Sequence, residues 1–584
     1  PAYQPALRFI QTDWTGGHGQ YEFADRSKYI EGQSIDTTQP RCVFLGPLIT
    51  EVKEDDDSEL DSTPVCFFWS EYLGKWFCAT TNGVYILGKT VANKWGLATG
   101  NISGVLGFAE LNNVIYAARG ATAAYAYSTD GETWTATNLT DSTAYGFVVA
   151  PNPAGTLDNL WKFKIPNEVS RTTNGRTAAA GGVAWESPTY VGETTNNIIN
   201  IFVNGDKLYV GKEDGLYWVD SSGGVHAELP DELKVNHSTN NFKYLTNWQG
   251  SSYFSLQMGL GELTTSDTYS PMGPLTDIDN IGKREFNIAG LSADKDWLYV
   301  AVYEGTYYHI YKGKETIVNG RLQWEWCPWV YLGTNTCAAI RVCQHTSTDR
   351  RLWFGYGTHT AYVILSSNPL ADSAARFCTS GWLRMSYLYG TNPLFDKLWQ
   401  SAVIEQTRYS YGAETEASDG ETVQVKYRDD MDLTSTSIIS AYNTAGVVET
   451  NLTSALNNKR ITFEIWLASD TSSATPCVTY FQAKGVEKPT LVRVHEAYYE
   501  VGDRPSDRAK TIRDLLRTAR TSTTLVKFAD LRWGQKTSGT TSGDYVWCVM
   551  QPGFPQEVEI IHAKGRSPEL AIHVRLQEVS FTIS

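Results

Sequence analysis

The hydrophobic and polar positions of the chain repeat as a hairpin pattern, most clearly in the segment LYVGKEDGLYWV at residues 208–219. Two apolar runs flank a short polar turn that contains glycine, which is the pattern of two antiparallel strands joined by a tight turn. The first two thirds of the chain are therefore predicted to contain seven similar β-hairpins. The looser copies begin at Phe77, Val114, Leu160, Ser252, Leu298 and Leu352.

The spacing of these copies predicts how they are arranged. Successive copies begin 37 to 54 residues apart, which is close to the roughly 40–50 residues of one four-stranded propeller blade. A single sheet of this kind leaves both faces exposed, whereas blades packed around an axis cover one another and leave only short edges. We therefore predict an all-β protein with a seven-bladed β-propeller. A β-sandwich with similar hairpins is the alternative.

Two smaller domains are predicted after the propeller. Short strands separated by Ser/Thr/Asn-rich loops between residues 399 and 488 are typical of a β-sandwich. After Pro505, the segment SDRAKTIRDLLRTAR has apolar residues at helical spacing behind Ser506 or Asp507 as N-cap, and four strands follow it. The predicted domains are an N-terminal arm and ring-closing strand, the β-propeller, the β-sandwich and a small α+β C-terminal module, at residues 1–60, 61–392, 393–488 and 489–584.

Composition and charge limit the expected partners. Aromatic residues make up 12% of the chain and charged residues only 19%, which fits strands and turns better than long solvated helices. The net charge of −15 repels polyanions, so no nucleic-acid partner is expected. By contrast, residues 481–584 contain 15 Lys/Arg against 12 Asp/Glu. This basic tail is suited to docking on an acidic neighbour, although a chance fluctuation explains the count equally well.

The cysteines and the apolar runs point to an intracellular folding environment. The nine cysteines contain no CxxC pair, and several lie in strand-like apolar runs where a thiol is simply a small hydrophobe. No run approaches the roughly 18 apolar residues of a membrane span, and the opening PAYQPALRF has no secretory signal. We therefore expect neither a disulfide scaffold nor membrane insertion.

The sequence offers no convincing enzymatic motif. GVYILGKT at Gly83 fits the Walker A expression, but its four middle residues are strand-forming, whereas a phosphate loop needs small, flexible residues. The acidic run at residues 54–57 lacks the alternation and the glycine of a calcium loop. HExxH and GxSxG are absent, and arginines in the propeller are sparse. We therefore predict a non-enzymatic protein with no catalytic residue, no cofactor and no metal site.

The segment STDGETW resembles the Asp-box of sialidase-like propellers, shortened by one residue between Asp130 and Gly131. In that family the box is a turn between the outer strands of a blade. Its Asp and Ser oxygens accept hydrogen bonds from turn amides, its Gly takes a positive φ, and its Trp packs inward. The resemblance implies a structural, not a catalytic, role for Ser128, Asp130, Gly131, Thr133 and Trp134.

Aromatic residues on propeller loops are candidates for surface binding. Flat apolar faces with polar edges suit both sugar rings and protein interfaces. For each residue the alternative is a place in the blade core. The candidates are Trp161, Tyr307, Tyr308 and Tyr389.

The C-terminal order of a helix followed by strands that end in ELAIHVRLQEVSF resembles modules at the ends of bacteriophage tail proteins. DWTGGHGQY and KLYVGKEDGLYWVD likewise resemble β-propeller proteins encoded among phage structural genes. The resemblance implies a virion component of the tail, fibre or host-contact apparatus, assembled in the host cytoplasm. Its expected partners are copies of itself and other virion tail proteins, with a host-surface glycan or protein as a further candidate. The alternatives are an Asp-box protein that binds or hydrolyses carbohydrate, and a cellular scaffold with a kelch-like ring.

Overall fold

The structure, a computed structural model, describes most of the chain as β-strand, which confirms the predicted all-β character. The chain divides into two compact units, Pro1–Glu487 and Lys488–Ser584. The residues not described are 1–5, 152–157, 221–222, 228–235, 278–282, 319–320, 345–349, 391–395, 416–419, 430–433, 489–493, 501–510, 512–513, 519–525, 529–545, 552, 561–568 and 579–584.

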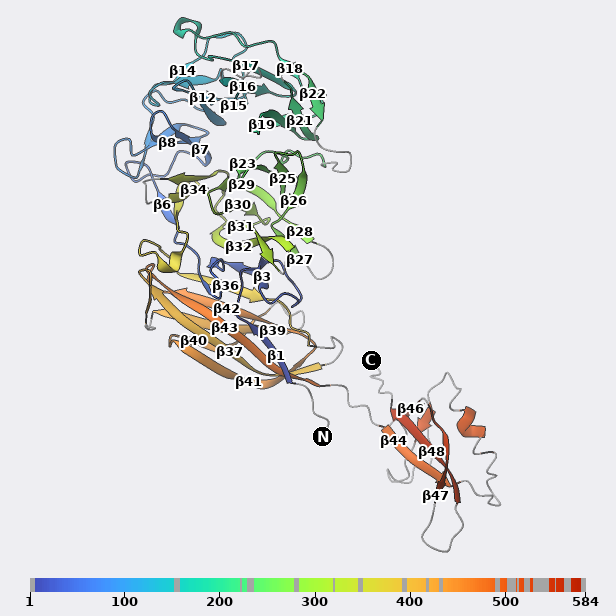
Figure 1. The fold of residues 1–584 in the computed structure, drawn as a ribbon. Helices are drawn as coiled ribbons and strands as arrows, with labels where there is room; N and C mark the ends of the chain where they lie inside the picture. The colour runs from blue at the N-terminus through green and yellow to red at the C-terminus, as the bar shows by residue number, and fades with distance from the viewer. Residues whose placement is uncertain are drawn as a thin grey trace. The chain divides into compact units, whose positions relative to one another are not determined.

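Within the first unit, the described residues form seven four-stranded antiparallel sheets (Figure 1). Six of them consist of four consecutive strands, and the seventh takes its fourth strand from near the N-terminus. In order, they are β7–β10 (Pro64–Ser70, Lys75–Thr80, Val84–Leu87, Trp95–Leu97), β11–β14 (Gly107–Leu111, Val114–Ala118, Ala126–Ser128, Thr135–Ala136), β15–β18 (Gly146–Pro151, Asp158–Lys164, Glu168–Thr172, Thr189–Tyr190), β19–β22 (Ile198–Asn204, Lys207–Lys212, Gly215–Val219, Val225–Ala227), β23–β26 (Leu245–Trp248, Ser251–Ser255, Leu260–Thr264, Tyr269–Met272), β29–β32 (Asn287–Ala293, Leu298–Tyr303, Tyr308–Val318, Arg321–Gly333), and β33–β35 with β6 (Ile340–Gln344, Arg350–Tyr356, His359–Leu365, Thr50–Val52).

The repeated hairpins of the sequence are the second and third strands of these sheets. In the clearest copy, β20 pairs with β21 so that Lys212 lies opposite Gly215 and two polar residues make the turn. The Walker-like segment after Gly83 is strand β9, as its apolar middle residues predict. The hairpin prediction holds because each repeat forms its hydrogen bonds locally and faces apolar side chains towards neighbouring sheets.

Neighbouring sheets share apolar cores, so that the sheets follow one another around a closed ring. One core, for example, packs Phe77 and Ile86 of the first sheet against Ile115 and Trp134 of the second. Another packs Trp353 of the last sheet against Trp95 of the first. The ring is also closed by hydrogen bonds, because β6 is the outer strand beside β35. This radial arrangement of four-stranded sheets is that of a β-propeller.

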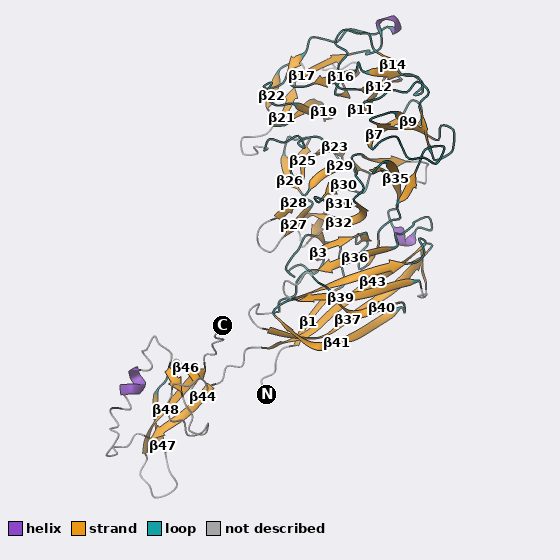
Figure 2. Cartoon of the chain, turned by 180° about the vertical axis from the view of Figure 1, so that it is seen from behind, coloured by secondary structure: helices purple, strands orange, loops and turns teal. Residues whose placement is uncertain are grey.

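A two-layer β-sandwich adjoins the propeller within the same unit, and Figure 2 shows β3 and β36 between β32 and the rest of the sandwich. Its sheets contain seven and six described strands. Strands from outside the predicted range 393–488 also belong to the sandwich. Near the N-terminus, β1 pairs with β43, and β3 pairs with β36, which in turn pairs with β42. The strands are β1 (Ala6–Gln11), β2 (Gly17–His18), β3 (Lys28–Gln33), β4 (Ile35–Asp36), β5 (Val43–Leu45), β36 (Ser380–Met385), β37 (Asp396–Ser410), β38 (Ala413–Thr415), β39 (Glu421–Asp429), β40 (Thr436–Tyr442), β41 (Gly446–Asn458), β42 (Ile461–Ser469) and β43 (Ala474–Lys488).

The sandwich core combines residues from the two ends of the unit. Trp14 and Phe44 pack with Trp399, Phe463 and Phe481, and four of these five side chains are completely buried. The described residues of the unit also form the hairpin β27–β28 (Leu275–Asp277, Lys283–Glu285) and the 3-10 turns η1 (Ala178–Ala180) and η3 (Pro369–Ala371).

The second unit has its own small sheet and core. Its strands are β44 (Val494–Glu500), β45 (Val526–Phe528), β46 (Val546–Met550), β47 (Gln556–Ile560) and β48 (Glu569–Glu578). Cys548, Ile572, Val574 and Leu576 form the core. Thr511 and residues 514–518 are helical, in agreement with the predicted helix, whose other residues lie outside the described part. Among the described residues, no helix has the length and apolar character needed to cross a membrane.

Candidate functional site

A buried ion pair joins the propeller to the sandwich. The Nζ atom of Lys312, on β31, lies 2.5 Å from Oδ2 of Asp36, on β4, and both side chains are almost completely buried. Trp329 Nε1 donates a second hydrogen bond to the same oxygen (3.1 Å). The backbone amide and hydroxyl of Thr38 donate to the other oxygen. The carboxylate therefore keeps four donors, which offsets the cost of removing two charges from water.

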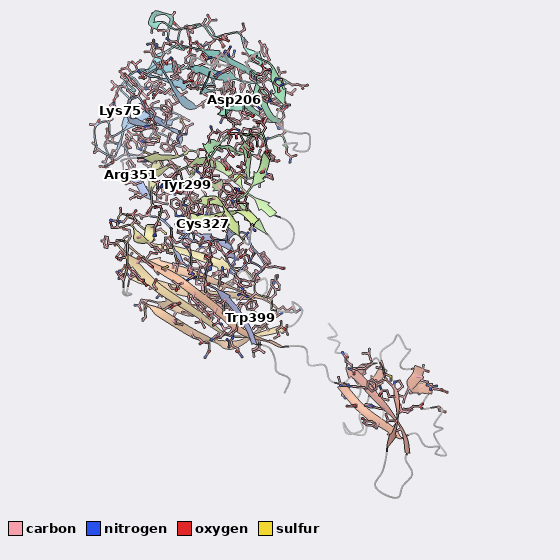
Figure 3. All side chains as sticks on the ribbon, viewed as in Figure 1. Lys75, Asp206, Tyr299, Cys327, Arg351 and Trp399 are labelled. Atoms are coloured by element: carbon pink, nitrogen blue, oxygen red, sulfur yellow. The ribbon has the colours of Figure 1, made fainter. Side chains whose placement is uncertain are left out.

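The backbones also meet at this junction. A Cβ atom at Gly17, where φ is +80°, would lie 2.7 Å from the backbone N and O of Trp326 on β32. Only glycine fits such an approach. Cys327 Sγ donates to the carbonyl of Ile35, and Figure 3 labels Cys327 where the propeller meets the sandwich and Trp399 within the sandwich. The glycine turn in DWTGGHGQY thus serves close contact between the two domains.

A cleft of about 560 Å³ opens beside this junction, and we call it the junction cleft. It lies between the β30–β32 end of the propeller and strands β2, β3 and β36 of the sandwich. A volume of this size is ordinary for a small-molecule site. Its lining residues are His18, Tyr21, Ile30, Glu31, Gly32, Gln33, Phe286, Glu304, Tyr307, His309, Tyr311, Tyr331, Trp382 and Arg384.

Two buried histidines lie in the wall of the junction cleft. His18 is 7% exposed, and its ring lies against Tyr311, with centroids 4.8 Å apart. Burial, with smaller contributions from His309 and Lys28, lowers the pKa of His18 to about 3. Burial also lowers the pKa of His309 to about 4. Both imidazoles are therefore neutral at physiological pH and present one donor and one acceptor each.

The charged and polar groups of the cleft are partly paired with one another. Arg384 Nη2 lies 2.8 Å from Glu31 Oε1, across the pairing of β3 with β36. Tyr311 donates its hydroxyl to Glu304 Oε1 (3.1 Å). Trp382 Nε1 donates to Gln33 Oε1 (3.1 Å), and this bond fixes the edge of the indole beside the cleft. The cleft therefore has one charge pair, one further carboxylate and several aromatic faces.

The predicted surface aromatics have different surroundings. Tyr307 is 46% exposed and lines the junction cleft, where its ring centroid lies 5.9 Å from that of Tyr331. Tyr308 is half-buried and packs against Tyr303. Tyr389 is half-buried and accepts a hydrogen bond from Arg460 (2.9 Å). Of these three, Tyr307 is the one that lines the junction cleft.

Trp161 differs from the prediction of an exposed side chain. It is 6% exposed, because its side chain lies on the face of the β15–β18 sheet that packs against the β19–β22 sheet. The guanidinium of Arg171 lies 5.3 Å from its ring centroid and forms an ion pair with Glu186. These three residues line a separate cleft of about 430 Å³.

The Asp-box-like segment forms a tight turn between β13 and β14. Asp130 Oδ1 accepts hydrogen bonds from the amides of Glu132 and Thr133, both 2.8 Å long, and Ser128 Oγ accepts from the amide of Gly131 (2.8 Å). Gly131 has a φ of +75°, and Trp134 is buried in the core between the first two sheets. Partial burial alone would raise the pKa of Asp130, but these hydrogen bonds outweigh it and hold the pKa below its usual value. Each of these contacts is internal to the propeller.

Sequence reasoning missed most of the junction cleft. His18 lies in DWTGGHGQY and His309 in EGTYYHIY, two segments that stand out in the sequence for their glycine and aromatic content. Trp382 and Arg384 come from a strand far from either segment, and only the pairing of β3 with β36 brings them to the cleft. Within the described residues there is no group of three His, Cys, Asp or Glu side chains arranged to hold a metal ion.

Comparisons with known proteins give fold-level similarity only. No protein-family model matches the chain, and no curated protein matches it. Among solved structures, it is similar to the extracellular domain of the hybrid two-component system BT4673 from B. thetaiotaomicron, with 10% identity over 73% of this chain and a TM-score of 0.40. The chain spans 62% of the length of that structure.

Two further solved structures are similar to the chain over nearly their whole length. YCF48 from Cyanidioschyzon merolae has 15% identity and a TM-score of 0.35, with coverage of 54% of this chain and 98% of its own. The AfRom2 CNH domain has 11% identity and a TM-score of 0.35, with coverage of 55% and 99%. None of the comparisons assigns the chain to a family.

Proposed function

We propose that the chain is a non-enzymatic structural component of a phage virion, in the tail, fibre or host-contact apparatus. In this proposal the seven four-stranded sheets are the blades of a seven-bladed propeller, which displays a binding surface. The second unit is a small α+β module that attaches the chain to its virion partners, which include further copies of the chain and other tail proteins. Closed symmetry is the usual arrangement of such copies.

The proposal that the propeller displays a binding surface is supported by its buried connection to the sandwich. The pair formed by Lys312 and Asp36 lies in the interior, and breaking one partner of such a pair costs far more than breaking a surface pair. Close packing of Gly17 on Trp326 adds a backbone contact. A propeller held in this way is suited to transmit force and orientation to the sandwich.

The second unit supports the proposed attachment by its independence and its charge. It has a separate core around Cys548 and Ile572. Residues 488–584 contain 14 Lys/Arg against 11 Asp/Glu, whereas the whole chain has a net charge of −15. A basic module on an otherwise acidic chain favours docking to an acidic neighbour.

The test is a truncation after Lys488, the last residue of β43. A cut near residue 393 would remove β37–β43 from the two sheets of the sandwich and expose its core. A cut after Lys488 leaves these strands in place. Phage particles produced with the full chain or with the truncated chain would be purified on a density gradient, and their protein content measured by mass spectrometry.

We expect the full chain in purified particles at a fixed copy number, and the truncated chain at less than a tenth of that level. The truncated protein should keep the melting temperature of the first unit. Absence of the full chain from particles would overturn the virion role. Equal incorporation of the truncated chain would overturn the attachment role of the second unit, and hydrolysis of a glycan by the purified chain would overturn the non-enzymatic assignment.

A further inference from the structure

We propose that the junction cleft binds a neutral saccharide, with a sugar ring against its aromatic wall and hydroxyl groups towards His18 and Arg384. The inference concerns a site between propeller and sandwich and does not depend on the virion role proposed above. It stands on the cleft's volume, its aromatic lining, two buried polar atoms and its charge balance.

The aromatic lining suits the apolar face of a sugar ring. Tyr307 is 46% exposed, and Tyr331 and Trp382 are half-buried beside it in the cleft. His309 packs on Tyr331, with ring centroids 4.9 Å apart, and Trp382 stacks on Trp466 at 5.8 Å. These contacts hold the rings in place, so little side-chain entropy is lost when a ligand stacks on them.

Two nitrogens on side chains that line the cleft have no hydrogen-bond partner among the described residues, which favours a ligand with polar groups. His18 Nε2 is buried and makes no hydrogen bond to any described residue, although the side chain is more than nine-tenths buried. Arg384 Nε is likewise buried and lacks an acceptor among the described residues. Buried polar groups in folded proteins nearly always have a partner. A hydroxyl group satisfies both atoms, because it accepts a hydrogen bond from the guanidinium and either donates to or accepts from a neutral imidazole.

The charge balance favours a neutral ligand over an anion. Glu31 is paired with Arg384, and Glu304 adds a carboxylate that accepts from Tyr311. Burial keeps His18 and His309 uncharged, because their pKa values are lowered to about 3 and about 4. With one guanidinium against two carboxylates, the cleft repels carboxylated and phosphorylated ligands, and it offers carboxylate oxygens to sugar hydroxyl donors.

The experiment uses the purified full chain on an array of immobilised oligosaccharides that contains neutral hexose and N-acetylhexosamine chains together with sialylated and uronic-acid chains. The strongest neutral hit is then titrated in solution and followed by tryptophan fluorescence. Tyr307→Ala is the test variant, since Tyr307 is half exposed and its truncation leaves the core intact. Tyr72→Ala is the matched control, a tyrosine of similar exposure (50%) that does not line the junction cleft.

We expect binding to neutral oligosaccharides, weakened about tenfold or more by Tyr307→Ala and unchanged by Tyr72→Ala. His18→Gln, which keeps a donor and an acceptor but changes their positions, should weaken binding by a smaller factor. Absence of any neutral hit would overturn the inference. Stronger binding to sialylated or uronic-acid chains would also overturn it, as would equal affinity of the Tyr307→Ala variant and the unmodified chain. Incorporation into particles is a separate readout, so failure of the virion role and failure of saccharide binding are distinguishable.

Discussion

The propeller and the sandwich are both antiparallel β-structure, but their strands find partners in different ways. In six of the seven propeller sheets each strand pairs with the next strand in the sequence, as Lys212 and Gly215 do across a two-residue turn. In the sandwich, Ala6 lies opposite Val486. Closing a longer loop costs more conformational entropy. The contacts of the sandwich therefore stabilise the chain only after most of it has folded.

The seventh sheet combines both ways of pairing. Strands β33–β35 are consecutive, whereas β6 arrives from the N-terminal side, and Thr360 Oγ1 donates to the carbonyl of Val52 across 308 residues. Local hairpins therefore specify the repeated unit, and a few long-range contacts decide how the ring closes and how it is attached. Single substitutions at these long-range contacts should therefore lower the free energy of unfolding more than substitutions at local contacts within one sheet.

The largest effect is expected from breaking the junction. Asp36→Ala leaves the Lys312 ammonium buried without its carboxylate, so the free energy of unfolding should fall by about 3–5 kcal/mol. Lys484→Ala, which removes a partly exposed ion pair with Glu449 in the sandwich, is the control and should cost less than about 1 kcal/mol. Denaturant unfolding followed by tryptophan fluorescence measures both, and equal losses would contradict a special role for the junction.

Acid should weaken the same region. In the unfolded chain His18 and His309 take up protons as the pH falls below about 6.5, whereas in the folded chain their pKa values are about 3 and about 4. The unfolded state then binds more protons, so this stability is fully present above pH 6.5 and is lost as the pH falls towards 4. The loss is about 1.5 kcal/mol for each histidine between pH 6.5 and 5.

His18→Gln provides the control for this pH effect, because glutamine does not titrate. Its free energy of unfolding should fall less steeply between pH 6.5 and 5 than that of the unmodified chain. The groups near the two histidines are Lys28 and Glu304, the latter 3.8 Å from His309. Parallel pH profiles for the variant and the unmodified chain would show that folding does not lower the pKa of His18.

Ring closure should show an intermediate effect. Thr360→Val keeps the volume of the side chain but removes the acceptor of Trp95 Nε1, which donates at 2.6 Å from a fully buried ring. An unsatisfied buried donor costs about 1–3 kcal/mol. Thr358→Val loses only an exposed hydrogen bond to Glu59, so the melting temperatures of the two variants should differ by about 1–3 °C in a unit of this size. Coinciding melting curves would mean that the contact between Trp95 of the first sheet and Thr360 of the last contributes little to closure.

The smallest effect is expected within a single sheet. Asp130→Ala removes the acceptor of two turn amides, which should cost about 0.5–2 kcal/mol, as for other side-chain caps of backbone amides. Asp56→Ala removes the acceptor of one amide, from Ser58, in an exposed loop and should cost less. Urea unfolding measures the difference, and a loss at Asp130 as large as that at Asp36 would contradict the contrast between local and long-range contacts.

Part of the junction cleft could be predicted from the sequence. The sequence predicts Tyr307 as a surface aromatic on a propeller loop, and it lines the junction cleft. It makes the same prediction for Trp161, which instead takes the alternative place in the blade core, because aromatic side chains serve equally well in a core and on a surface. His18 carried no signal of its own, since its significance comes from the burial that Phe286 and Tyr311 impose.

What the sequence by itself determined is the repeated hairpin and the β-propeller built from it. Alternating apolar residues and polar glycine turns act over about ten residues, and this range is visible along the chain. Only the tertiary structure decided that Asp36 pairs with Lys312 and that Trp382 and Tyr307 line the same cleft. These pairings depend on strand register over hundreds of residues, and register is set by the burial of whole faces, not by the residues at the site.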